Sequence, residues 1–195
     1  MMRAPARLYR RFIASTRGVA AIEFAMIMPV LLILFLSSFD AANAIAVYMK
    51  VRSATYTLAA VTNQYGTGTN AISTADMTAI TGATGAVLAP YSSTPTVVTI
   101  SQIVATSNTQ ATVSWSDSVN GTPLATGATY TLPANFAKNT CGGNYPCYFV
   151  LASVSYTFTP EFGAFLTGPI NLADSLYATP RISACIQYNS VPSSC

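Results

Sequence analysis

Apolar residues dominate the first third of the chain, and they follow two different patterns in turn. Between residues 24 and 39 nearly every position is apolar, and only one proline and two serines interrupt the run. Together with residues 19–22 the run is about 20 residues long, enough at ~1.5 Å per residue to cross a bilayer core of ~30 Å as a helix. The pattern predicts a transmembrane segment over about residues 22–39, with a kink at Pro29, where a helix loses one backbone hydrogen bond.

After residue 40 the apolar positions narrow to a single stripe. The stripe has spacings of four, three, four and three, the period of one face of an α-helix, and it consists of Val47, Val51, Ala54, Leu58 and Val61. Lys50, Ser53 and Thr57 fall off this stripe. We therefore expect one continuous helix over residues 19–63, half membrane-embedded and half amphipathic, whose stripe packs on a globular head.

The next segment favours a short second helix. Gly66 and Gly68 break the first helix, because glycine is the strongest local interruption of a helical pattern apart from proline. Residues 72–88 then favour a helix, with Ser73 or Thr74 as the N-cap, since a hydroxyl can accept a hydrogen bond from the first free backbone N–H groups.

From residue 96 onward apolar and polar positions alternate, which is the period of a half-buried β-strand. The alternation predicts strands over residues 96–104, 111–115, 148–158, 170–178 and 182–188, the first two forming a hairpin with a turn near Ser107-Asn108. We expect an α+β fold: a long N-terminal helix, a short second helix, and an antiparallel sheet of four or five strands packed on the helix stripe.

The distribution of charge predicts how the chain is oriented. Charged residues make up 8% of the sequence, against a usual ~25%, and the formal net charge is +3. The first 18 residues hold five of the nine bases and no acid: Arg3, Arg7, Arg10, Arg11 and Arg17. The remainder has four bases against six acids, a side-chain balance of −2, so no basic surface is available for nucleic acid.

A cluster of bases before an apolar run places that end of the chain in the cytoplasm. We therefore expect three parts: a basic leader over residues 1–18, the helix over 19–63, and a periplasmic α+β head over 64–195. This arrangement corresponds to a single-pass inner-membrane protein.

All four cysteines follow the apolar run, on the side that is oxidising in this orientation. Cys141 and Cys147 flank a loop with two glycines, and we expect a disulfide there; metal ligation or a reactive thiol are the alternatives. Cys185 and Cys195 would form a second bridge, although four cysteines allow three pairings.

The residues of an enzyme are largely missing. The chain has no histidine, which excludes the common Ser-His-Asp and Cys-His sites and every histidine-bearing zinc site. Glu161 and Asp174 could in principle act as a carboxylate pair on a glycoside, but each is interpreted as a solvent-facing acid. Gly66-Thr67-Gly68 lacks the rest of a phosphate-binding loop. We expect no enzyme, no cofactor, no metal and no small-molecule substrate.

Glu23 is the one carboxylate at the mouth of the apolar run, where charge is poorly tolerated. It follows Gly18 by five positions and precedes Phe24, and this spacing resembles the recognition site of a prepilin peptidase. The resemblance implies cleavage after Gly18, so that Val19 becomes the first residue. The wider segment, from Arg17 to about Ala60, resembles the TadE-like family of tight-adherence (Flp-type) pilus pseudopilins, although Asp40 stands near where that family usually carries a glutamate.

The resemblance implies a pilin-like minor pseudopilin or pilus assembly protein of a tight-adherence type IV pilus, with membrane lipid, the prepilin peptidase and other pilin subunits as partners. In pilin assembly the carboxylate at the position of Glu23 attracts the freed amine of a neighbouring subunit, which would here be that of Val19. One alternative is a secreted or surface β-rich binding domain, exported by a signal peptide cleaved after Ala42-Asn43-Ala44. An extracytoplasmic hydrolase is a third, and a chance carboxylate is the alternative reading of Glu23.

Overall fold

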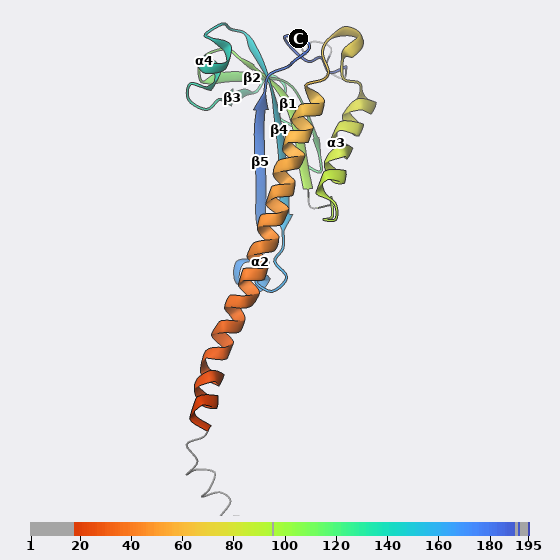
Figure 1. The fold of residues 1–195 in the computed structure, drawn as a ribbon. Coiled ribbons are helices and arrows are strands. Elements are labelled where there is room, and N and C mark those ends of the chain that lie inside the picture. Colours follow the sequence, from red (N-terminus) through yellow and green to blue (C-terminus); the bar gives the residue numbers. More distant parts are fainter. Residues whose placement is uncertain (1–17, 95, 190, 192–194) are drawn as a thin grey trace, which may run out of the picture.

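The computed structural model describes residues 18–94, 96–189, 191 and 195, so the predicted basic leader lies almost entirely outside the described residues. One long helix, α2 (Val19–Thr62), runs the length of the molecule (Figure 1). Its first half projects beyond the rest of the fold, and its second half packs against the other helix and the sheet. Pro29 lies inside this helix, as the sequence predicts.

The second helix, α3 (Thr74–Leu88), follows a short 3-10 turn over Gly68–Asn70. Ser73 is its N-cap: the Ser73 hydroxyl accepts a hydrogen bond from the N–H of Asp76, and the Asp76 carboxylate accepts one from the N–H of Ser73. This reciprocal arrangement satisfies two donors at the helix start. The helix continues through Gly82 and Gly85.

Five antiparallel strands form one sheet in the order β3-β2-β1-β4-β5. Their bounds are β1 Thr96–Ala105, β2 Gln110–Val119, β3 Thr129–Thr131, β4 Cys147–Phe158 and β5 Ile170–Ala178. Two short helices, α4 (Phe136–Cys141) and α5 (Ala164–Thr167), lie in the connections on either side of β4. The α+β fold and the predicted hairpin, β4 and β5 are confirmed.

The strand predicted over residues 182–188 is wrong. Tyr188 makes only isolated bridges, to Ile72 and Val191, and β3 is the fifth strand instead. The backbone of this segment bonds to the loop before α3: the N–H of Gln187 donates to the Gly66 carbonyl, and the Gln187 carbonyl accepts from the N–H of Ile72, both at 2.8 Å. The segment therefore pairs with the loop that connects α2 and α3, and it does not extend the sheet.

The main core lies between the sheet and the two long helices. The stripe on α2 faces it, with Val47, Val51, Ala54 and Leu58 buried and Val61 partly buried. Trp115 is fully buried in the same cluster, and its indole N–H donates to the Ile186 carbonyl at 2.8 Å. A second cluster, around Phe149 and Leu132, fills the opposite face of the sheet under α4.

Candidate functional site

The first half of α2 is an apolar surface that no other element covers among the residues that the structure describes. Its large side chains are exposed on every side of the helix, from Ile22 at 65% to Phe35 at 71%. An 18-residue window of the helix is long and apolar enough to cross a membrane, and none of it is buried. A signal sequence near an N-terminus has the same character. Water is a poor solvent for so long an apolar run, and a helix of this length and character fits a single-pass membrane anchor.

The predicted processing residues lie together at the start of this surface. Gly18 is the N-cap of α2, and Val19 and Glu23 are one turn apart on the same face, both exposed. A Cβ atom on Gly18 would meet nothing within 4 Å, and its φ of −95° is open to any residue. The fold of the described chain therefore places no demand for glycine at this position.

Glu23 has no base within reach along its own helix. The next base of the chain is Lys50, 27 positions later, which corresponds to a rise of about 40 Å. A carboxylate at this edge of an apolar surface is a group that a cation from outside the helix could pair with.

A second carboxylate ends the apolar surface, and it is held very differently. Asp40 is only 7% exposed. Its carboxylate oxygens accept hydrogen bonds from three successive backbone N–H groups, those of Glu161 at 3.1 Å, Phe162 at 3.1 Å and Gly163 at 2.6 Å. We call this arrangement the Asp40 clamp, and the segment 160–170 that donates to it the clamp loop.

Small size matters on the loop side of the clamp. A Cβ atom on Gly163 would lie 3.2 Å from an Asp40 oxygen, tighter than an ordinary contact. Beside the clamp, the rings of Phe39 and Phe162 pack edge to face with their centroids 5.8 Å apart, and both stay about half exposed, at 50% and 47%. The sequence marked Asp40 only as a departure from a family pattern. One feature of the sequence could have indicated the clamp: Asp40 directly follows an apolar run, and a carboxylate in such a place needs hydrogen-bond donors.

The four cysteines form two bonded pairs in the structure, Cys141 with Cys147 and Cys185 with Cys195. The first pair joins the end of α4 to the start of β4, and the second fastens the tail next to buried Ile186. Among the described residues there is no group of three or more His, Cys, Asp or Glu side chains that could hold a metal ion. Glu161 belongs to the clamp loop and Asp174 to β5, opposite Val154 of β4.

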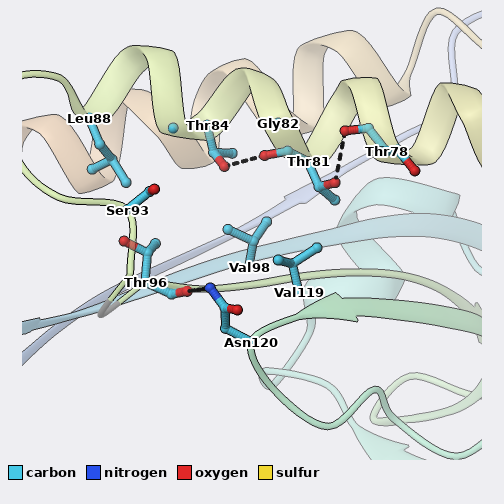
Figure 2. A pocket seen from close by; sticks show the side chains of 11 residues that line it. Thr78, Thr81, Gly82, Thr84, Leu88, Ser93, Thr96, Val98, Val119 and Asn120 are labelled. Carbon is cyan, nitrogen blue, oxygen red and sulfur yellow. Dashed lines mark hydrogen bonds between the residues drawn. The ribbon is translucent and has the colours of Figure 1, made fainter.

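A cavity of about 270 Å³ lies between α3 and the β1–β2 hairpin (Figure 2). Hydroxyl groups line it, and those of Thr81 and Thr84 donate back to carbonyls of their own helix. Asn120 donates to the Thr96 carbonyl at 2.9 Å, while the buried Thr96 hydroxyl has no hydrogen-bond partner among the described residues. The residues that line the cavity include no charged side chain, so the cavity offers no group for acid–base chemistry.

Comparison with known proteins bears on the first helix. The family model for TadE-like protein matches residues 18–60. The match begins at Gly18 and ends two residues before α2 does, and it confirms the resemblance to TadE-like proteins on this helix. The TadE-like segment thus contains Gly18, Glu23 and Asp40, and it leaves the sheet unmatched. No curated protein and no solved structure matches the chain.

Proposed function

We propose that this protein is a minor pseudopilin, or a pilus assembly protein, of a tight-adherence type IV pilus. In this proposal the first half of α2 anchors the chain in the inner membrane, with residues 1–18 as a cytoplasmic leader and the part from residue 64 in the periplasm. The protein is a structural subunit and not an enzyme. The observation that carries the proposal is the exposed turn with Gly18, Val19 and Glu23 at the start of an exposed apolar helix within the TadE-like segment.

Processing after Gly18 is part of the proposal. The peptidase would need access to the bond between Gly18 and Val19, and both residues are exposed. Because the fold has room for a side chain at Gly18, the glycine is explained by a demand from outside the folded chain. The freed amine of Val19 would then pair with Glu23 of a neighbouring subunit, which removes the cost of two unpaired charges near lipid.

The Asp40 clamp argues against the signal-peptide alternative. Cleavage after Ala44 would cut α2 in its middle and remove Asp40 from the chain. Three backbone N–H groups of the clamp loop would then lose their acceptor, and buried donors without partners are costly. The folded protein is therefore better explained with the helix intact.

Two variants test the proposal in cells that make the pilus. Gly18→Leu should leave the protein at full length on a gel, whereas the unsubstituted protein should begin at Val19 on N-terminal sequencing. Glu23→Gln should be cleaved and inserted normally but should no longer capture other pilin subunits, with Glu23→Asp intermediate.

The matched control is Glu161→Gln, an exposed acid on the clamp loop that should cleave and capture partners like the unsubstituted protein. A mature protein beginning at Ile45 would contradict processing after Gly18 and support the signal-peptide alternative. Normal partner capture by a correctly cleaved Glu23→Gln protein would remove the pairing role of Glu23.

A further inference from the structure

The clamp loop lies at the level where the apolar surface of α2 ends. Figure 1 shows the connection between β4 and β5 at the end of the sheet from which the first half of α2 projects. The Asp40 clamp fixes this loop to α2, and Phe162 packs on Phe39, the last residue of the apolar run. The loop therefore keeps one fixed height on the helix.

Helix length places that height relative to a bilayer. From Val19 to Phe39 the helix rises about 30 Å, close to the ~30 Å thickness of a hydrocarbon core. With the start of the apolar run at one boundary of the core, Phe39 and the Phe162 ring beside it lie near the other boundary. Aromatic side chains are favoured at this depth because they combine an apolar body with tolerance of a wet edge.

The chemistry of the loop also suits the edge of a membrane. Phe162 and Ile170 are 47% and 37% exposed, and the space between the loop and α2 is an apolar cavity of about 200 Å³, lined by residues such as Ala41, Ala44 and Pro160. Near lipid an unpaired backbone N–H is costly, and Asp40 satisfies three of them in succession. The exposed Glu161 carboxylate limits how deep the loop can go, because a charge stays among the headgroups.

We propose that the clamp loop is a second membrane contact: Phe162 and Ile170 rest in the headgroup–acyl boundary of a phospholipid bilayer, and the Asp40 clamp sets the height of the sheet above it. This inference rests on the proposed membrane anchor. It adds that the sheet stands directly on the bilayer surface and is not held away from it on a free length of helix.

Tryptophan probes test the two proposals separately in full-length protein reconstituted in phospholipid vesicles. Three variants report on three heights: Leu31→Trp within the apolar half, Phe162→Trp in the clamp loop, and Tyr145→Trp at the other end of β4. Tyr145 is 36% exposed and about 40 Å from the loop along this 12-residue strand. Trp115 is fully buried in the structure and is retained in all three variants, so its emission should be a constant background and a check that the sheet is folded.

The vesicles then carry a bromine label on the acyl chain, placed either near the headgroup (the high label) or near the methyl end (the low label). Leu31→Trp should lose most emission to the low label, Phe162→Trp should lose most to the high label, and Tyr145→Trp should lose none. Adding Asp40→Asn to Phe162→Trp should reduce quenching by the high label, because the loop is released from the helix.

Quenching of Leu31→Trp together with an unquenched Phe162→Trp would overturn the membrane contact of the loop and leave the anchor intact. Absence of quenching in all three variants would overturn both. Unchanged quenching of Phe162→Trp after Asp40→Asn would overturn the role of the clamp.

Discussion

Both halves of α2 contain many apolar residues, yet they belong to different environments. In the first half, apolar side chains occupy all sides of the helix and are exposed; Leu32, for example, is 48% exposed. In the second half they form one stripe that the sheet and α3 bury; Leu58 is 1% exposed. Asp40 marks the boundary between the two halves.

The comparison shows how the arrangement of apolar residues around a helix is matched by what covers it. A stripe needs one apolar neighbour, and this chain supplies it. A helix that is apolar on every side needs a solvent that surrounds it, and the described part of the chain contains nothing of that kind. The predictions that follow test this difference.

The largest effect should come from one substitution made in both halves. Leu58→Ala should lower the free energy of unfolding by about 2–5 kcal/mol, because it leaves a cavity in the core. Leu32→Ala, the matched control on the same helix, should change it by less than about 0.5 kcal/mol in detergent. Chemical denaturation followed by Trp115 emission measures both. Equal losses in the two variants would contradict the division of the helix.

An intermediate effect is expected at the boundary. Asp40→Ala should lower the free energy of unfolding by about 1–3 kcal/mol, because the N–H groups of the clamp loop lose their acceptor. Hydrogen exchange of Phe162 and Gly163 should become faster, while exchange in β1 stays slow. Glu161→Ala is the control, since it removes an exposed acid from the same loop and leaves the clamp intact. Unchanged exchange in Asp40→Ala would show that the clamp does not hold the loop.

The smallest effect concerns α3, which helps to bury the second half of α2. Ser73→Ala removes the N-cap and should cost about 1 kcal/mol. The Ser73 hydroxyl and backbone N–H hold the pKa of Asp76 below its usual value. Stability from this contact is therefore complete above the unfolded pKa of ~3.9 and is lost as pH falls through the lower, folded pKa.

Below about pH 4 the free energy of unfolding should therefore depend less steeply on pH in Ser73→Ala than in the unsubstituted protein. Thr78→Ala, which removes an exposed hydroxyl from the same helix, is the control and should keep the original profile. The same pH dependence in all three proteins would show that Ser73 does not stabilise the Asp76 carboxylate.

The sequence predicted those elements whose pattern is long and regular. The stripe on α2 and the alternation in β4 each repeat several times, and both are confirmed by burial. β3 has three residues and α5 has four, too few for a period to be recognised. Residues 182–188 alternate like a strand, but the backbone of the segment is taken up by the loop before α3 and by the Gln102 side chain, which accepts from the N–H of Ile186 at 2.6 Å.

The same reasoning explains which parts of the site could be anticipated. Gly18 and Glu23 lie five positions apart, and that spacing is visible in the sequence. The partners of Asp40 are backbone N–H groups 121 to 123 positions away, and backbone groups leave no residue pattern to read. Processing at Gly18 and the pairing of Glu23 stay predictions.

The unbroken course of α2 has a mechanical consequence. Since one helix joins the apolar half to the sheet, a pull on the sheet is carried along its axis and not absorbed by a flexible linker. Pro29, the proline inside α2, weakens the hydrogen-bond ladder on the apolar side of Asp40, so bending under load is concentrated there. The part above the clamp is stiffened by the sheet and should move as a single lever arm.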